Sequence, residues 1–285
     1  MPTDAAKISI QSYMGDFQSM LKSLFLVKDP TRLMKRLSRY GVINREEYEE
    51  YWAFKASKFT YKEEGLWTTK NVDFLEDPAF QRAFKLGKET GSWGKRSLRY
   101  RNYIICWAAT QGAALEGDFV ECGVNKGGFA RMIIDYVGFE KLNKQFWLLD
   151  TYEGLVEECF TEEEKACGKE VGNYYEPCYE TVVKTFQPFP NVKIIKGVIP
   201  HTLPEVTCEK VAFLSIDMNC VLPEIAAIEY FWERLTPGAP VVLDDYGWPE
   251  HEEQKKGFDQ FAKQHNIQVL TLPTGQGLII KPSLG

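Results

Sequence analysis

The stretch Gly117-Asp-Phe-Val-Glu-Cys-Gly-Val-Asn-Lys-Gly-Gly128 is the most informative part of this 285-residue sequence. An apolar run through Phe119 and Val120 enters a glycine-rich turn, and a second apolar run, Phe129–Ile134, follows it. This order predicts a strand, a tight turn and a helix whose free N–H groups face a ligand. The spacing differs from the dinucleotide-binding G-x-G-x-x-G, and glycines also mark ordinary loops, so the turn alone does not define a site.

Four predicted strands of this chain end in acidic residues. The apolar run Phe146–Leu149 leads into Asp150, which lies 27 residues after Gly123, about where a βαβ unit places an acid against a ribose. In an open parallel sheet, ligands bind beyond the carboxyl ends of the strands. Acids at four strand ends would therefore line one crevice, and they are Glu121, Asp150, Asp217 and the pair Asp244-Asp245.

The composition excludes several classes of function. Lys and Arg number 34 and Asp and Glu number 40, so the formal net charge is −6 and no basic surface typical of nucleic-acid binding is expected. The seven cysteines show no short paired spacing, which predicts reduced thiols in a cytoplasmic protein. The first residues lack the apolar core of a signal peptide, and no apolar run approaches ~18 residues, so we expect no membrane partner.

The chain divides into two predicted parts. Residues 1–96 are predicted to be a helical extension, and the apolar face of its first helix, over residues 8–26, suggests a homodimer contact. Residues 97–285 are predicted to be an α/β domain with a lid-like insertion at 151–185, for which a solvated surface excursion is the alternative. The loop Gly91-Ser-Trp-Gly94 is interpreted as a hinge or lid over the site, or as a plain connector.

The α/β domain is predicted to contain a mostly parallel sheet with helices on both faces. The last two apolar runs, 267–272 and 278–281, are joined by Pro273-Thr-Gly-Gln-Gly277, and so short a connection requires antiparallel neighbours. We therefore expect a seven-stranded sheet with a terminal antiparallel strand. The other five strands are predicted at 119–122, 146–149, 192–197, 211–216 and 239–243.

Five motifs in order give the chain a family resemblance. They are Asp118-Phe-Val-Glu-Cys-Gly-Val124, Leu149-Asp-Thr-Tyr-Glu-Gly154, Lys196-Gly-Val-Ile-Pro200 with Thr202-Leu-Pro204, Phe213-Leu-Ser-Ile-Asp217, and Leu243-Asp-Asp-Tyr-Gly247. Together they resemble the macrocin O-methyltransferase family, which includes sugar methyltransferases of novobiocin and mycinamicin biosynthesis. The resemblance spans about residues 117–280. It implies a Rossmann-like class I methyltransferase fold, S-adenosylmethionine as methyl donor, and a magnesium ion.

The resemblance also implies roles for single residues. Asp217 would be the general base, and it would also bind the metal and contact the cofactor. The metal-binding set would be Asp217, Asp244 and Asp245. The cofactor-binding set would be Glu121 and Gly123 at the methionine part, Asp150 at the ribose and Gly197 at the adenine, with Asn125, Lys126 and Thr151 around them.

The chemistry of these residue types agrees with the implied roles. An alcohol is a poor nucleophile until it loses its proton, and a hard divalent cation held by carboxylates lowers the pKa of a bound hydroxyl. Three aspartates without His or Cys favour Mg²⁺ over zinc. Asp217 could then accept the proton, while orientation of the hydroxyl against the methyl group supplies further rate. The family resemblance, and not the residues themselves, implies the acceptor: a hydroxylated small natural product, either a sugar or a vicinal diol.

Two departures from the family pattern leave substrate and cofactor contacts open. Met218-Asn219-Cys220 follows Asp217 where relatives often have a second acid and a tyrosine, so Asn219 is a candidate substrate contact. Phe129 stands where a small hydroxyl residue often meets the cofactor carboxylate, which leaves Asn125 or Lys126 for that contact.

Three other functions are alternatives at this point. The first is a methyltransferase that acts on a non-sugar oxygen or nitrogen without a metal. The second is a non-catalytic protein that binds S-adenosylmethionine. The third is a nucleotide-sugar or dinucleotide oxidoreductase, which the missing G-x-G-x-x-G disfavours.

Overall fold

The computed structural model describes residues 35, 37–39, 41, 43–45, 59–171 and 175–283. The chain splits into two compact units, Met1–Phe59 and Thr60–Gly285, and the following description concerns the second. The predicted helix over residues 8–26, and the homodimer contact assigned to it, lie outside the described residues. That contact stays a prediction.

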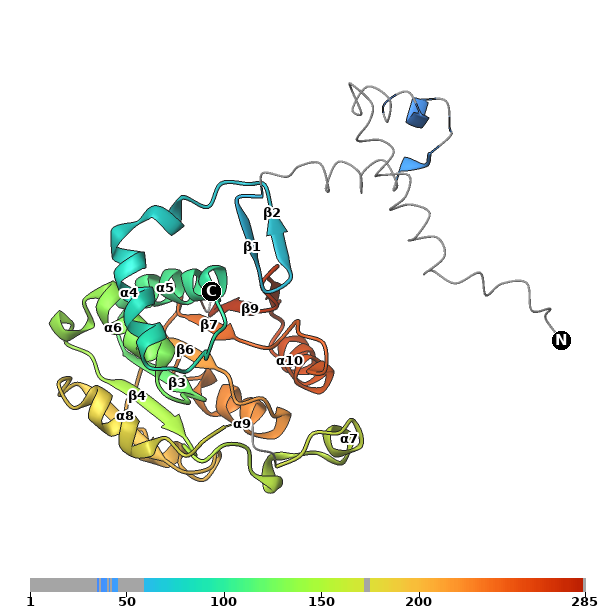
Figure 1. Ribbon diagram of the computed structural model, residues 1–285. Coiled ribbons are helices and arrows are strands. Elements are labelled where there is room, and N and C mark those ends of the chain that lie inside the picture. Colours follow the sequence, from blue (N-terminus) through green and yellow to red (C-terminus); the bar gives the residue numbers. More distant parts are fainter. Residues whose placement is uncertain are drawn as a thin grey trace. The chain divides into compact units, whose positions relative to one another are not determined.

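A seven-stranded sheet forms the centre of the second unit (Figure 1). Its strand order is β5-β4-β3-β6-β7-β9-β8. The first five strands in this order run parallel, and β9 pairs antiparallel with both β7 and β8. The predicted mostly parallel sheet with an antiparallel end is thereby confirmed. The strands are β3 (Asp118–Cys122), β4 (Phe146–Asp150), β5 (Val192–Lys196), β6 (Val211–Ile216), β7 (Pro240–Leu243), β8 (Leu270–Thr271) and β9 (Gly277–Ile280).

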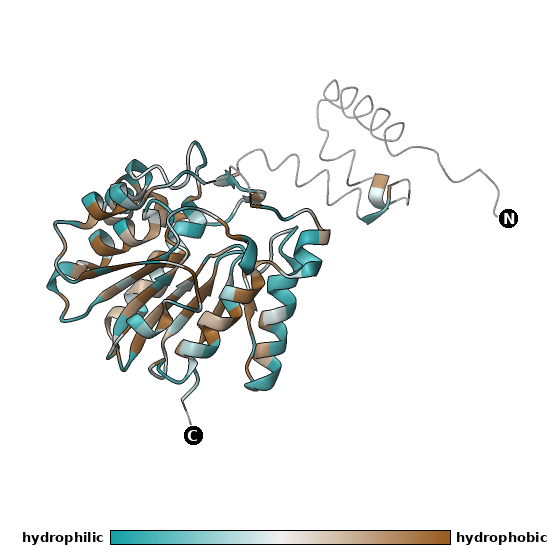
Figure 2. Cartoon of the chain, turned by 90° about the horizontal axis from the view of Figure 1, so that it is seen from below, coloured by the Kyte–Doolittle hydropathy of each residue, from teal (hydrophilic) through white to brown (hydrophobic). Residues whose placement is uncertain are grey.

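Apolar side chains on both faces of the sheet form two separate cores. Phe119 and Phe213 point into one core, while their neighbours Val120 and Leu214 point into the other. This alternation without a polar face is typical of parallel strands that helices cover on both sides. In Figure 2 the central strands are coloured as apolar, and the helices on either side of them are polar on their outer surfaces.

Helices cover the sheet in two layers. The helices α5 (Arg99–Ala113), α6 (Gly128–Val137) and α8 (Tyr179–Phe186) contribute to one core, and α4 (Pro78–Glu89) packs on the outside of α6. The other core receives α9 (Val221–Trp232) and α10 (Glu252–Gln264). Within the described residues, no helix is both long enough and apolar enough to cross a bilayer.

The segment between residues 60 and 96 belongs to the same compact unit as the sheet. It contains a hairpin of β1 (Tyr61–Glu63) and β2 (Leu66–Thr68), followed by α4. Asp77 caps α4 by accepting the N–H of Ala79 at 3.0 Å, as its position before Pro78 predicts. The compact unit therefore begins at Thr60, whereas the sequence placed the boundary at residue 97. The reason is that α4 buries its apolar side chains, Phe80 among them, against α6.

Candidate active site

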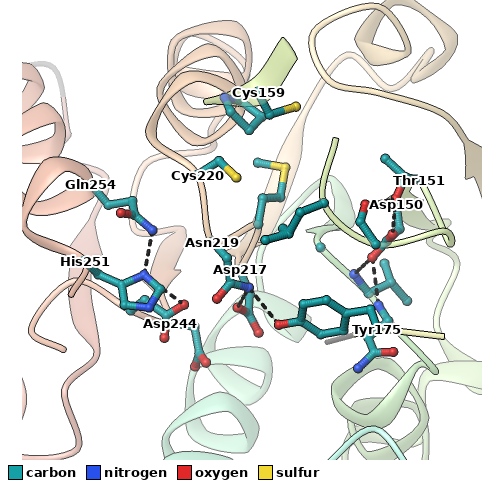
Figure 3. A pocket seen from close by; sticks show the side chains of 18 of the residues that line it. Asp150, Thr151, Cys159, Tyr175, Asp217, Asn219, Cys220, Asp244, His251 and Gln254 are labelled. Carbon is teal, nitrogen blue, oxygen red and sulfur yellow. Dashed lines mark hydrogen bonds and ion pairs between the residues drawn. The ribbon is translucent and has the colours of Figure 1, made fainter. Parts of the chain in front are cut away.

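A cavity of about 1620 Å³ lies beyond the carboxyl ends of the parallel strands (Figure 3). Two backbone hydrogen bonds extend the sheet by one residue beyond the ends of β6 and β7. The Asp217 N–H donates to the Cys122 carbonyl (2.8 Å), and the Asp244 N–H donates to the Ile216 carbonyl (3.0 Å). The side chains at these positions consequently open into one space. All residues assigned to the site from the sequence line this cavity: Glu121, Gly123, Asn125, Lys126, Asp150, Thr151, Gly197, Asp217, Asp244 and Asp245.

The glycine-rich turn approaches the neighbouring strand so closely that no side chain fits. Gly123 has a φ of +88°, and a Cβ atom there would lie 1.9 Å from the carbonyl oxygen of Asp217. Only glycine adopts this conformation and tolerates this contact without strain. The turn therefore fixes the distance between the end of β3 and the end of β6.

Asp150 holds the glycine-rich turn in place. Its Oδ2 accepts the backbone N–H groups of Val124 (2.6 Å) and Asn125 (2.8 Å), and its Oδ1 accepts that of Tyr152 (2.6 Å). The next residue, Thr151, donates its hydroxyl to the carbonyl of Gly154 at 2.7 Å and shapes the following loop. The Asp150 carboxylate is thus tied to the turn and aimed into the cavity, while the backbone N–H of Gly197 donates to its main-chain carbonyl (2.9 Å).

Glu121 is a buried carboxylate on the wall of the cavity. Its side chain is 1% exposed, and its Oε2 has no hydrogen-bond partner among the described residues. Burial, together with the negative charges of Asp150 and Asp244, raises the pKa of Glu121 well above its usual range. A buried carboxyl group without a partner costs free energy unless a ligand satisfies it. The arrangement fits a ligand that carries a positive charge or a hydrogen-bond donor.

The loop Gly91–Gly94, interpreted from the sequence as a hinge, a lid or a connector, lies against the helix start. The hydroxyl of Ser92 accepts the N–H of Gly128 at 2.9 Å, so it satisfies one of the free donors at the first turn of α6. Asn125 donates to the Ser92 carbonyl at 3.4 Å, and the Nζ of Lys126 lies 3.3 Å from Glu176. Sequence analysis missed Ser92 because a serine 36 residues before the helix gives no local signal.

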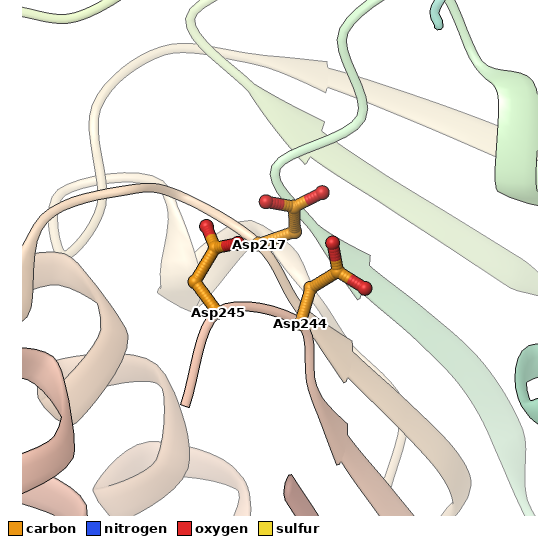
Figure 4. A group of neighbouring side chains, drawn as sticks. All are labelled: Asp217, Asp244 and Asp245. Carbon is orange, nitrogen blue, oxygen red and sulfur yellow. The ribbon is translucent and has the colours of Figure 1, made fainter. Parts of the chain in front are cut away.

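Three aspartates form a compact cluster at the other end of the cavity (Figure 4). One carboxylate oxygen from each of Asp217, Asp244 and Asp245 lies within 4.8 Å of those of the others. Burial and mutual repulsion raise the pKa of Asp217 well above its usual range. For Asp244, burial raises the pKa to about 6, against the opposing effect of Arg101, and burial also raises that of Asp245.

Arg101 supplies a buried positive charge to this cluster. It lies in the first turn of α5, and its Nη1 donates to Asp244 Oδ2 and lies 3.9 Å from Asp245 Oδ1. Gln276, on the turn before β9, donates to the other oxygen of Asp244 at 2.9 Å. Neither residue was assigned to the site from the sequence, because an arginine 143 residues before Asp244 has no detectable spacing relation to it.

The donor set of the cluster fits a hard divalent cation. Carboxylate oxygens without nearby thiolates are the ligands that Mg²⁺ and Ca²⁺ prefer. The three carboxylates carry more negative charge than the single guanidinium of Arg101 balances, and burial raises the pKa of each of them. A dication bound by Asp217, Asp244 and Asp245 would remove this excess of negative charge.

The insertion after β4 closes one side of the cavity and is attached to the loop after β6. Lys169 contacts the buried carboxylate of Glu164 at 3.0 Å and also donates to the carbonyl of Asn219. The side chain of Asn219 donates to the hydroxyl of Tyr175 (3.2 Å) and lies 3.5 Å from Asp217 Oδ1 (Figure 3). Asn219, the departure noted in the sequence, is therefore in contact with the candidate base.

The strand order, the antiparallel final strand and the cavity at the strand ends define the fold of class I methyltransferases. Two solved structures share it at low identity, which supports the fold alone. The O-methyltransferase NovP matches with a TM-score of 0.61 and 17% identity, over 72% of this chain and 98% of that one. The calicheamicin methyltransferase CalS11 matches with a TM-score of 0.50 and 14% identity, over 75% of this chain and 94% of that one.

The sequence comparisons identify the family. The macrocin-O-methyltransferase (TylF) family matches residues 92–271. Mycinamicin III 3''-O-methyltransferase of Micromonospora griseorubida is 24% identical over 59% of this chain and 69% of its own length. The second relative is an 8-demethyl-8-(2,3-dimethoxy-alpha-L-rhamnosyl)-tetracenomycin-C 4'-O-methyltransferase of Streptomyces olivaceus. It is 26% identical over 52% of this chain and 60% of its own length. The chain belongs to the macrocin-O-methyltransferase family, as the resemblance of its motifs indicated.

Proposed function

We propose that this protein transfers a methyl group from S-adenosylmethionine to a hydroxyl group of a sugar or vicinal diol on a small natural product, in a magnesium-dependent reaction. The observation that carries the proposal is the pairing of two features in one cavity. Glu121, whose buried Oε2 has no hydrogen-bond partner in the described part of the chain, lies beside the glycine-rich turn, and three aspartates lie at the ends of β6 and β7. The first suits a cationic cofactor and the second suits activation of a hydroxyl.

The turn after β3 is the proposed binding site of the cofactor. The unpartnered oxygen of Glu121 would accept the ammonium group of the methionine part, because a charged donor satisfies a buried carboxylate best. Asp150 would meet the ribose hydroxyls. Its oxygens already accept three backbone N–H groups, which hold the carboxylate in one orientation. The remaining proposed contacts are Gly123, Asn125, Lys126, Thr151 and Gly197, with Asp217 at the junction with the acceptor site.

Asp217 is the proposed general base. Its carboxylate lines the cavity beside Asn219, and a carboxylate placed next to the acceptor hydroxyl can take up its proton. A magnesium ion bound by Asp217, Asp244 and Asp245 would lower the pKa of the acceptor hydroxyl. Asn219 and Tyr175, which are linked by a hydrogen bond of 3.2 Å, would orient the acceptor beside the base. Correct alignment of the hydroxyl oxygen with the methyl group then lowers the barrier further.

The proposed acceptor class is supported by the size of the cavity and by the names of the two relatives. Ligand pockets usually measure about 300–1,000 Å³, so a cavity of about 1620 Å³ has room for a cofactor and a sizeable acceptor together. One relative is named as a 3''-O-methyltransferase of mycinamicin III. The other is named as a 4'-O-methyltransferase of a rhamnosyl-tetracenomycin.

The test combines ligand binding with turnover. Calorimetry should detect binding of S-adenosylhomocysteine, and glycosylated acceptors with a free vicinal hydroxyl should gain one methyl group from S-adenosylmethionine in the presence of Mg²⁺. The double variant Asp244→Asn, Asp245→Asn should lose turnover while it retains binding of S-adenosylhomocysteine. The proposal fails if the wild-type protein binds S-adenosylhomocysteine but methylates only acceptors that contain neither a sugar nor a vicinal diol.

A metal-independent methyl transfer is the second candidate, and Arg101 favours it. The guanidinium already neutralises part of the acid cluster through Asp244 and Asp245, so Asp217 could act as base without a bound ion. Turnover that is unchanged in EDTA would establish this candidate in place of the first. Turnover that disappears in EDTA and returns with Mg²⁺ would exclude it.

A further inference from the structure

Arg101 occupies a position in which it competes with a bound cation. Its guanidinium lies between the acid cluster and the β1–β2 hairpin, and its side chain is 8% exposed. Nη1 is directed at Asp244, one of the three proposed metal ligands, and approaches a second, Asp245. A guanidinium and a divalent cation that share the same carboxylates repel each other and compete for the same lone pairs.

A second acidic partner for Arg101 lies on the opposite side of its guanidinium. Glu64, in the tight turn between β1 and β2, has a φ of +50° and places its Oε1 3.7 Å from the Nε of Arg101. That Nε is buried and has no hydrogen-bond partner among the residues that the structure describes. The ring of Trp248 lies 4.9 Å from the guanidinium carbon and limits the directions in which the group can turn.

From this geometry we infer that Arg101 and Glu64 act as positioning residues that set the affinity of the aspartate cluster for its divalent cation. Without the ion, Arg101 neutralises Asp244. When the ion binds, the guanidinium leaves Asp244 and pairs fully with Glu64. This inference rests on the proposed metal-dependent function, and it assigns a role to the hairpin that the proposed reaction does not require.

The physical reason is the cost of an unpaired buried charge. A buried arginine that loses its carboxylate partner is strongly destabilising, so an ion can displace Arg101 from Asp244 only if a second carboxylate is available. Glu64 provides it, since its Oε1 already lies 3.7 Å from the Nε of Arg101. Burial raises the pKa of Glu64 to about 7, and pairing with the guanidinium opposes that rise, which agrees with an incomplete ion pair in the ion-free state.

The first experiment measures metal binding directly. Mn²⁺ binding to the full-length protein is followed by electron paramagnetic resonance, and Mg²⁺ binding by calorimetry. Arg101→Gln should bind both ions roughly tenfold more tightly than the wild type, because the internal competitor is gone. Arg99→Gln is the matched control: Arg99 lies two residues earlier in the same helix and pairs with Glu63, so its removal should leave the affinity unchanged.

The second experiment tests the alternative partner. Glu64→Gln should weaken ion binding roughly threefold to tenfold, because Arg101 then has only the metal ligands as partners. Glu63→Gln removes a carboxylate from the adjacent position and should have no such effect. In the Arg101→Gln background, Glu64→Gln should also have little effect. A simple loss of negative charge near the site would instead weaken binding equally in both backgrounds.

The possible outcomes distinguish failure of the proposed metal-dependent function from failure of this inference alone. If the wild-type protein binds neither Mn²⁺ nor Mg²⁺, the metal-dependent function and this inference are both wrong. If it binds them and neither Arg101→Gln nor Glu64→Gln changes the affinity, only this inference is overturned. Should Arg101→Gln fail to fold, Arg101→Lys and Glu64→Gln retain the test, since lysine keeps the charge without the planar fork and should bind ions more tightly than the wild type.

Discussion

The two ends of the cavity differ in how their polar groups are satisfied. At the glycine-rich turn, the Asp150 carboxylate accepts three backbone N–H groups and Ser92 accepts a fourth from the start of α6. At the other end, one guanidinium contacts two of the three carboxylates, and burial raises the pKa values of all three.

This difference separates a preformed site from one that needs its ligand. The turn keeps its shape through internal hydrogen bonds and through the fit of Gly123 against the Asp217 carbonyl. The aspartate cluster is electrostatically unfavourable by itself, and a cation would stabilise it through differential binding to the folded state. We therefore expect substitutions at the first end to change stability and cofactor affinity, and substitutions at the second to change turnover and its dependence on pH and metal.

The largest expected effect is the loss of the general base. Asp217→Asn should reduce kcat/KM by about 10³, or roughly 4 kcal/mol, because the amide cannot accept the acceptor's proton. The dissociation constant of S-adenosylhomocysteine should change much less. Asp259→Asn, which removes a carboxylate paired with Lys255 on α10, serves as control and should leave kcat/KM unchanged. A tenfold or smaller loss in Asp217→Asn would assign the base elsewhere.

The glycine-rich turn provides the next test. Gly123→Ala should lower the free energy of unfolding by about 3 kcal/mol, because the new methyl group collides with the Asp217 carbonyl. Gly138→Ala is the matched control, since Gly138 also has a positive φ, of +63°, but no atom lies within 4 Å of its Cβ position. Urea unfolding of both variants separates the free-energy cost of the steric clash, which only Gly123→Ala has, from the cost of a positive φ, which both variants have. Equal losses would show that the two strand ends move apart readily.

The burial of Asp244 predicts a dependence of stability on pH. In the folded, metal-free protein the pKa of Asp244 is raised from 3.8 to about 6. A raised pKa means that the folded state holds the proton more tightly, so this contribution is present below pH 4 and lost as the pH rises through about 6. The stability of the wild type relative to Asp244→Asn should fall by about 3 kcal/mol over that interval in EDTA.

The opposite slope would contradict this prediction. It would mean that Arg101 stabilises the Asp244 carboxylate by more than burial destabilises it. Addition of Mg²⁺ at neutral pH should restore the stability of the wild type and leave that of Asp244→Asn nearly unchanged.

The smallest expected effect concerns Ser92. Ser92→Ala removes the acceptor for the Gly128 N–H and should lower the free energy of unfolding by about 1 kcal/mol. It should also weaken binding of S-adenosylhomocysteine a few-fold, because the first turn of α6 loses its support. Thr185→Ala removes an exposed hydroxyl that bonds within α8 and should change neither quantity. If Ser92→Ala binds S-adenosylhomocysteine as tightly as the wild type does, Ser92 does not support cofactor binding.

The sequence predicted the sheet because its signals are local. Apolar runs between turn residues marked all seven strands, and the short connection Pro273–Gly277 required the antiparallel end. The acids were found in the same way: each directly follows or ends an apolar strand, and parallel strands bring their carboxyl ends to one edge. Gly123, Asp150, Asp217, Asp244 and Asp245 could thus be assigned to one cavity without coordinates.

The residues that complete the site could not be predicted, because their positions depend on packing between distant segments. Ser92 reaches the helix start only because α4 packs on α6, and this packing joins residues 60–96 to the compact unit of the sheet. Arg101 reaches the aspartates from a helix, and Glu64 reaches Arg101 from a hairpin, and neither element's own sequence indicates this charge pairing.

By itself, then, the sequence determined the order of the strands along the chain, the glycine-rich turn and the acids that follow the strands, because these depend on short-range periodicity and on the geometry of parallel sheets. Only the tertiary structure decided which charges meet the acids. A buried ion pair between Arg101 and Asp244 forms across 143 residues, and such a contact is fixed by the packing of α5 on the sheet and not by any local pattern.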